Sequence, residues 1–231
     1  TFTHTSLEVI GAGDAHGRPD PAATEVVLKL GARHPEPGPL GVLAREIAPA
    51  GLSMAPGMSG VMGGRPRPAP AIGVTSLLLE KAGVPVRVVL GGESVDVAVA
   101  PGDRATLVAT EPATLGPPRD EGELVPLLRI AHGRSGDKGD DANIGLLARR
   151  PELLPVLREQ LTPERVQEAF AHYGPSEVVA WDLPGVQGVN FLLRDVLGGA
   201  GGTTSLRYDP QGKGYAQILL ELPVRVPKEL L

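Results

Sequence analysis

The sequence contains no cysteine among its 231 residues. This absence excludes disulfides, thiolate nucleophiles, and zinc or iron–sulfur sites that use cysteine ligands. Because a chain without cysteine fits a reducing compartment, we expect a cytoplasmic protein. The sequence also lacks an uninterrupted apolar run of about 18 residues and a basic leader followed by an apolar segment. We therefore expect neither a membrane span nor a signal peptide.

Charge of one sign is not concentrated in any part of the sequence. The 27 acidic and 22 basic residues are interspersed and give a formal net charge of −5. A protein that follows a phosphate backbone needs a stripe of lysine and arginine, so we expect no nucleic-acid partner. With 42% hydrophobic residues, the chain can still bury an ordinary core.

Turn-forming and charged residues divide the sequence into two parts. They interrupt the apolar pattern at 101–103 and again at 115–123. We place a linker at 111–123, between a first part at 1–110 and a second part at 124–231. The chain opens at Thr1, without methionine and directly in a strand-like alternation. We therefore expect this chain to be part of a longer protein.

Hydrophobic spacing predicts a mixture of helices and strands in the first part. Val26, Val27 and Leu30 fall at helical spacing, and Gly91-Gly92 fits a hairpin turn. The predicted elements are a strand at 2–10, helices at 22–32 and 40–47, a helix or buried strand at 72–81, and hairpin strands at 84–90 and 94–100.

The second part predicts a split βαβ, ferredoxin-like layer of helices on one face of a sheet. The fold class is therefore α+β, with an α/β-like first part. Thr162 and Pro163 fit the start of a helix. The predicted elements are strands at 124–131 and 178–183, helices at 143–149, 152–160, 162–172 and 186–197, and a hairpin that pairs 203–209 with 214–222.

The segment from His132 to Asn143 is the main candidate for a functional site. Between a strand and a helix, backbone N–H groups attract an anion, and glycines let a ligand approach closely. An arginine can clamp a phosphate or carboxylate, while a lysine adds a point charge. The predicted ligand-binding residues here are Arg134, Gly136, Lys138, Gly139 and Asn143.

Other chemistry remains open for the same segment. A histidine side chain is a common general acid or base, so His132 is a catalytic candidate, with Ser135 and Asp137 as further candidates. Asp137, Asp140 and Asp141 could bind a magnesium ion, which prefers oxygen ligands. A simpler interpretation is that the glycines and aspartates only form the turn and cap the next helix. The spacing of a Walker phosphate loop is absent.

A second segment, from Ala48 to Arg67, is too long and too apolar for a simple connector. Its methionines could line an apolar pocket, face a partner, or pack into the core. We expect its polar residues Ser53 and Arg65 to complete the ligand site.

The two segments resemble the acyclic terpene utilisation protein A (AtuA-like) family. The resemblance rests on Arg45-Glu-Ile-Ala-Pro-Ala-Gly-Leu-Ser-Met-Ala-Pro-Gly57 with Gly63-Gly-Arg-Pro66, on Arg134-Ser-Gly-Asp-Lys-Gly139 with Ala142-Asn-Ile-Gly145, and on Asn190-Phe191. The family usually carries asparagine at the position of Asp140. The resemblance implies the end of a large domain followed by a ferredoxin-fold domain, and it assigns no catalytic residues.

The resemblance also implies a role in the breakdown of acyclic terpenoids such as citronellol and geraniol. Their acids are degraded as acyl-CoA thioesters beside a biotin-dependent carboxylase. An anion-binding segment next to an apolar one suits such a CoA thioester, so we expect an acyl-CoA-type ligand. The alternative is a non-catalytic assembly module of an acyl-CoA-processing system. We also expect a homo-oligomer, completed by the missing N-terminal portion or by a partner subunit.

Overall fold

The computed structural model describes residues 1–60, 64–100, 120–199 and 204–231. The chain forms two compact units, of which one combines residues 1–74 with 112–231 and the other spans 75–111. Most of the predicted linker at 111–123 lies outside the described residues. No helix in the described ranges is both long and apolar enough to cross a membrane.

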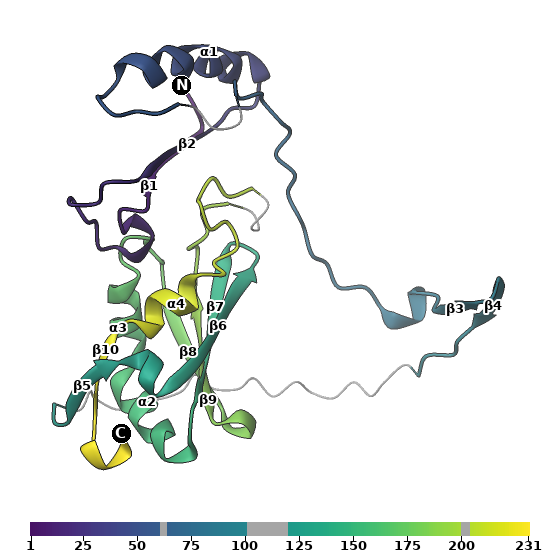
Figure 1. Ribbon diagram of the computed structural model, residues 1–231. Helices are drawn as coiled ribbons and strands as arrows, with labels where there is room; N and C mark the ends of the chain where they lie inside the picture. Colours follow the sequence, from purple (N-terminus) through teal and green to yellow (C-terminus); the bar gives the residue numbers. More distant parts are fainter. Residues whose placement is uncertain (61–63, 101–119, 200–203) are drawn as a thin grey trace. The chain divides into compact units, whose positions relative to one another are not determined.

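An antiparallel four-stranded sheet forms the centre of the larger unit (Figure 1). Its strands are β6 (Ala131–Lys138), β7 (Asp141–Ala148), β8 (Val178–Leu183) and β9 (Gly188–Leu193), in the spatial order β6-β7-β9-β8. Helices α2 (Leu154–Gln160) and α3 (Pro163–Ala169) connect β7 to β8. Because β9 lies between the two connected strands, this connection is a split βαβ.

The strand order is that of a ferredoxin-like sheet whose last strand stands first in the chain. Read from β7, the order is β7, the helices α2 and α3, β8, β9, helix α4 (Tyr215–Leu220), and then β6, which α4 contacts. This is the β-α-β-β-α-β sequence of the ferredoxin-like fold. Strands β5 (Glu123–Pro126) and β10 (Pro223–Val226) pair antiparallel, which brings the beginning and the end of this domain together. The predicted α+β, ferredoxin-like class is confirmed.

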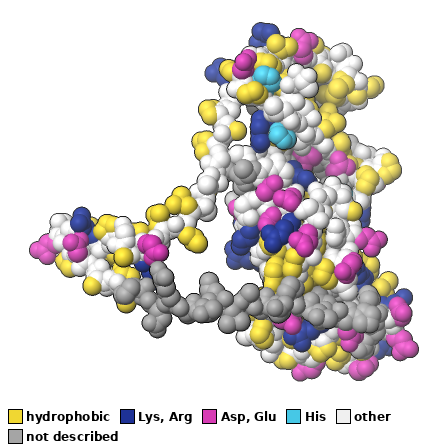
Figure 2. All heavy atoms as spheres, turned by 180° about the vertical axis from the view of Figure 1, so that it is seen from behind, with side chains coloured by type: hydrophobic (Ala, Val, Ile, Leu, Met, Phe, Trp, Pro, Cys, Tyr) yellow, Lys and Arg dark blue, Asp and Glu magenta, His cyan; other side chains and the backbone are white. Residues whose placement is uncertain are grey.

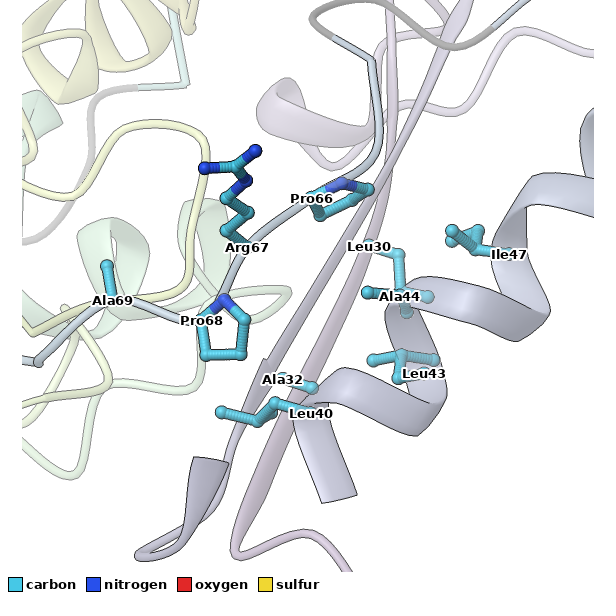
Figure 3. Close-up of a pocket in the computed structure, with 10 residues that line it drawn as sticks. All are labelled: Leu30, Ala32, Leu40, Leu43, Ala44, Ile47, Pro66, Arg67, Pro68 and Ala69. Carbon is cyan, nitrogen blue, oxygen red and sulfur yellow. The ribbon is translucent and has the colours of Figure 1, made fainter. Parts of the chain in front are cut away.

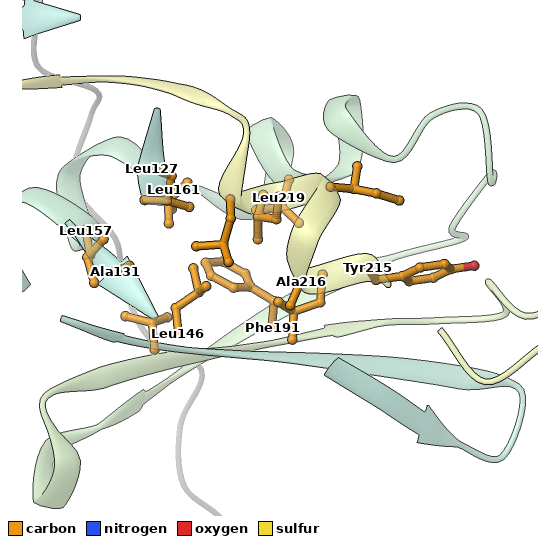
Figure 4. Packing of buried hydrophobic residues seen from close by; sticks show 14 of the residues in the cluster. Leu127, Ala131, Leu146, Leu157, Leu161, Phe191, Tyr215, Ala216 and Leu219 are labelled. Atoms are coloured by element: carbon orange, nitrogen blue, oxygen red, sulfur yellow. The ribbon is translucent and has the colours of Figure 1, made fainter. Parts of the chain in front are cut away.

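One face of the four-stranded sheet is buried beneath the helices (Figure 4). Alternate residues of β7 and β9 point to this face because side chains in a strand alternate between its two sides. Phe191 and Ile144, which are cross-strand partners, are both fully buried. The helices add Leu157, Val166 and Leu219 to the same core. We call this side the inner face and the opposite side the outer face.

The segment 1–74 contains a two-stranded sheet and a long helix. Strand β1 (His4–Ile10) pairs antiparallel with β2 (Val27–Arg33), and α1 (Pro37–Ser53) follows. The predicted strand at 2–10 and helix at 40–47 are confirmed, although α1 is longer than predicted. The predicted helix at 22–32 is wrong, because Val27–Arg33 forms a ladder with β1 that the apolar spacing alone did not indicate.

The unit 75–111 contains the predicted hairpin. Strands β3 (Arg87–Leu90) and β4 (Glu93–Asp96) pair antiparallel. Gly91 and Gly92 connect them with φ of 59° and 88°, a conformation that favours glycine at both positions. The predicted helix or buried strand at 72–81 is wrong, since those side chains are exposed and form no strand or α-helix.

Several elements of the second part also differ from the prediction. The strand at 178–183 and the cap formed by Thr162 are confirmed. In contrast, the predicted helices at 143–149 and 186–197 are wrong, because these segments form the strands β7 and β9. The predicted strand at 124–131 is the shorter strand β5 followed by a 3-10 turn. Helix α4 stands in place of the predicted hairpin at 203–222. Apolar residues on both faces of β7 and β9, such as Leu147 and Leu192, obscured the alternation that marks a strand.

Short 3-10 helices complete the described structure. They are η1 (Asp14–His16), η2 (Lys81–Gly83), η3 (Leu127–Arg129), η4 (Pro151–Leu153), η5 (Pro184–Val186) and η6 (Lys228–Leu230).

The assignment of the two faces predicts that substitutions at neighbouring positions of β9 lower the stability by different amounts. Phe191→Ala should lower the free energy of unfolding by roughly 3–5 kcal/mol, because it removes a fully buried ring from the core. Leu192→Ala, on the outer face of the same strand, should cost much less. Urea denaturation of both variants measures the difference. Equal losses would contradict the assignment.

Candidate functional site

The segment predicted as a loop before a helix is a β-hairpin. Residues 131–138 and 141–148 pair antiparallel, and Gly139 and Asp140 form the turn. Gly139 has φ of 71°, a conformation that favours glycine. No helix begins after this turn, so the predicted anion site at a helix N-terminus is wrong. The candidate residues lie instead on the two faces and at the tip of this hairpin.

The alternation of β6 separates the predicted catalytic residues from one another. Ser135 and Asp137 pair with Ile144 and Ala142, whose side chains are on the inner face. His132, Arg134 and Lys138 occupy the alternate positions and are exposed. The sheet therefore lies between His132 and the other two catalytic candidates.

On the inner face, Ser135 fastens strand β6 to the start of α4. Its Oγ accepts a hydrogen bond from the Ala216 N–H at 2.9 Å and donates one to the Lys213 carbonyl at 3.0 Å. Lys213 also contacts the Asp137 carboxylate, with an Nζ–Oδ1 distance of 3.2 Å. At the next position, 136, which faces outward, a Cβ atom would lie only 2.7 Å from Lys213 Nζ, so glycine leaves room for this side chain at the edge of the strand. These contacts hold the strand and helix together.

The three candidate metal ligands all have protein partners. Besides Asp137, Asp140 accepts a hydrogen bond from the Gly199 N–H at 2.8 Å. Asp141 accepts one from the Asp195 N–H at 3.0 Å and pairs with Arg194 at 3.2 Å. The described residues contain no cluster of three histidines or carboxylates suited to a metal ion. Asp140 and Asp141 therefore hold the β6–β7 turn against the residues that follow β9, while Asp137 holds β6 to Lys213.

On the outer face, cross-strand pairing places four residues in a row across the sheet. Arg134 lies opposite Gly145, Gly145 opposite Asn190, and Asn190 opposite Trp181. The glycine leaves the middle of this row without a side chain. Arg134 is exposed and makes no hydrogen bond or ion pair with any described residue. It is therefore a cation available to a ligand.

A chain of hydrogen bonds adjoins this row. Lys138 Nζ donates to Asn143 Oδ1 at 3.0 Å, and Asn143 Nδ2 donates to Asn190 Oδ1 at 3.0 Å. At the other end of β6, Arg149 lies 3.2 Å from His132 Nε2. The outer face therefore brings together four of the predicted residues: His132, Arg134, Lys138 and Asn143.

The opposite half of the outer face is apolar. The residues there are partly exposed and come from β8 and β9: Val179, Trp181, Leu183 and Leu192. Leu147 of β7, opposite His132, is a further apolar residue on this face. Seen from behind, the surface shows basic side chains next to a hydrophobic area (Figure 2). The sequence prediction missed Trp181, although its place in an alternating strand was a usable signal.

The second predicted segment does not join this hairpin. Ser53 is the last residue of α1, and its hydroxyl donates to the Pro49 carbonyl at 3.1 Å. Neither Ser53 nor Arg65 makes a hydrogen bond or ion pair with β6 or β7 among the described residues. Met54 and Met58 are 55% and 37% exposed, so neither is part of a core. The third methionine lies outside the described residues.

A small apolar pocket of about 190 Å³ lies between β2, α1 and residues 66–69 (Figure 3). Leu30 and Leu40 are among its lining residues, and the methionines are not. The Arg67 side chain extends away from the helix residues. This volume is below the usual range of ligand sites, roughly 300–1,000 Å³. We therefore assign no ligand to this pocket.

The contacts of Ser135 predict a structural role for this residue. Ser135→Ala should lower the free energy of unfolding by about 1–3 kcal/mol, because it leaves a buried N–H without its acceptor. Arg134→Ala should leave it unchanged within about 0.5 kcal/mol, since the side chain is exposed and unpaired. Thermal and urea unfolding of both variants test this, and a Ser135→Ala variant of full stability would contradict it.

Comparison with known proteins places the second part of the chain in a family. Residues 125–225 match the model of the AtuA ferredoxin-like domain. No curated protein and no solved structure matches the chain. The matched range contains the four-stranded sheet and the helices α2, α3 and α4. This agrees with both the observed topology and the resemblance seen in the sequence, and residues 125–225 therefore belong to the AtuA ferredoxin-like domain family.

Proposed function

We propose that this protein is a component of acyclic terpenoid or branched-chain acid catabolism that binds an acyl-CoA-type ligand on the outer face of its ferredoxin-like sheet. The family of the domain supports the metabolic role, because AtuA denotes acyclic terpene utilisation. One observation carries the ligand class: a cationic half and an apolar half adjoin on a single sheet face.

The polar half fits the phosphates of coenzyme A. The unpaired guanidinium of Arg134 can bind a phosphate through two parallel hydrogen bonds. Lys138 is four residues along the same strand, which places the two backbone positions about 13 Å apart. An acyl-CoA carries a diphosphate and a separate ribose phosphate, so two separated cations suit it better than they suit one small anion.

The apolar half fits the hydrocarbon part of the same ligand. Trp181 and Leu192 provide partly exposed apolar surface on the strands farthest from β6. Burial of this surface by an acyl chain is favourable by about 25 cal/mol per Å². The sequence predicted that the methionine segment supplies the apolar surface. In this proposal, β8 and β9 supply it instead.

No reaction is proposed for this face. Of the predicted catalytic residues, Ser135 and Asp137 hold β6 to α4 on the inner side. His132 lies on the outer face beside Arg149 and is the one catalytic candidate that a ligand bound there could reach. Its role as an acid or base stays a prediction.

Isothermal titration calorimetry with geranyl-CoA tests the proposal. Arg134→Gln should raise the Kd at least about tenfold, because a charge-assisted hydrogen bond is worth about 1.5–3 kcal/mol. Arg129→Gln is the matched control: Arg129 is an exposed arginine of the same domain, and it lies in η3 outside the sheet. Trp181→Ser should reduce the preference for geranyl-CoA over free CoA. Absence of saturable binding, or equal Kd values for the two arginine variants, would overturn the proposal.

The apolar half of the outer face also favours a second candidate, an assembly module that docks another copy or subunit. Exposed apolar surface on a sheet is typical of protein–protein contacts. In that case Trp181→Arg should dissociate an oligomer measured by sedimentation, while acyl-CoA should produce no heat in the calorimeter. Binding of the ligand by a monomer would contradict this candidate.

A further inference from the structure

A cavity of about 460 Å³ lies within the larger unit, away from the outer sheet face. Its walls come from three places in the chain: strand β1 with the start of η1, His172 and Tyr173 after α3, and the residues Gly198, Leu206 and Arg207. The lining residues that matter for its chemistry are Glu8, Asp14, His172, Tyr173 and Arg207. A volume of this size is within the range of small-molecule sites.

The two acidic groups of the cavity are already neutralised or hydrogen-bonded. Glu8 pairs with Lys29, with an Oε2–Nζ distance of 3.1 Å. Asp14 Oδ2 accepts a hydrogen bond from the Val9 N–H at 2.7 Å. Neither carboxylate lies within ion-pair distance of Arg207, so the positive charge of Arg207 is not cancelled by them.

Arg207 is a half-buried cation that forms no ion pair with a carboxylate of the described residues. Its guanidinium lies over the Tyr173 ring, 4.8 Å from the ring centre, and donates to the Tyr173 carbonyl at 3.1 Å. The aromatic ring fixes the plane of the guanidinium and leaves N–H groups for a ligand. A charge held in this way in a cavity attracts an anion.

The aromatic residues beside Arg207 are neutral near pH 7. Burial raises the pKa of Tyr173 to about 12, so its hydroxyl stays protonated and donates to the Ala15 carbonyl at 3.2 Å. Burial lowers the pKa of His172 below its usual value; a hydrogen bond to Ala15 opposes this shift, and nearby Arg207 favours it. The centres of the His172 and Tyr173 rings lie 4.3 Å apart, with the ring planes tilted by 42°, so the two rings form adjacent parts of one aromatic wall.

We propose that this cavity binds a small organic carboxylate, whose carboxylate group pairs with the guanidinium of Arg207 and whose apolar body rests against Tyr173 and His172. The planar carboxylate matches the two parallel N–H donors of arginine. Leu7 and Leu206 supply further apolar lining. The proposal is independent of the proposed function, because it uses none of the residues of the outer sheet face.

Titration of the protein with phenylacetate, followed by NMR, tests the proposal. The ring signals of His172 should shift with a saturable dependence on phenylacetate, while those of His34, which does not line the cavity, should not. Phenylacetamide has the same shape without the charge and should bind at least about tenfold more weakly, since it loses the charge-assisted bonds. Inorganic phosphate should also bind more weakly, because it lacks the apolar body.

A pair of variants isolates the role of Arg207. Arg207→Gln should weaken phenylacetate binding at least about tenfold. Arg194→Gln, which removes an exposed arginine paired with Asp141 and Glu177 outside the cavity, should leave it unchanged. If Arg207→Gln unfolds the protein, the comparison of phenylacetate with phenylacetamide on the unaltered chain still decides. No saturation up to about 10 mM, or equal binding of the amide or of phosphate, would overturn the proposal.

Discussion

The one-sided burial of the four-stranded sheet is the constraint on which the rest of this domain depends. The helices α2, α3 and α4 supply apolar side chains to the inner face only, where Ile144 and Phe191 are fully buried. Since side chains in a strand alternate between two faces, this packing also fixes which residues point outward. The positions of Arg134, Asn143 and Trp181 on the outer face follow from the core and need no loop to hold them.

The same constraint explains why the conspicuous Gly- and charge-rich segment does not act as a single cluster. Its inward residues, Ser135 and Asp137, connect β6 to the segment that begins α4. This connection matters because β6 is an edge strand with a pairing partner on one side only. A polar anchor at the edge of a sheet holds the strand in place without additional apolar burial. The charged residues of the segment are therefore divided between the two sides of one strand.

The order of the strands gives the domain its second characteristic. The sheet has the ferredoxin-like strand order, although the strand that would normally come last, β6, precedes the other three strands in the chain. The pairing of β5 with β10 brings the two ends of the domain together, so that either order of the chain allows the same packing. The packing of the core depends on which strands and helices are in contact, and it depends little on where in the fold the domain begins and ends.

The sequence by itself determined the α+β class, the ferredoxin-like family of the second part, the hairpin at Gly91-Gly92, the helix cap at Thr162 and the strand at 178–183. Each of these features depends on residues that are close together in the sequence, so the sequence alone can indicate it. Only the tertiary structure decided that 143–148 and 188–193 are strands, that Ser135 and Arg134 face opposite sides, and that Arg207 meets Tyr173 in a cavity. These depend on pairing and burial between distant segments, and apolar residues on both faces of a strand hide its period until its partners are known.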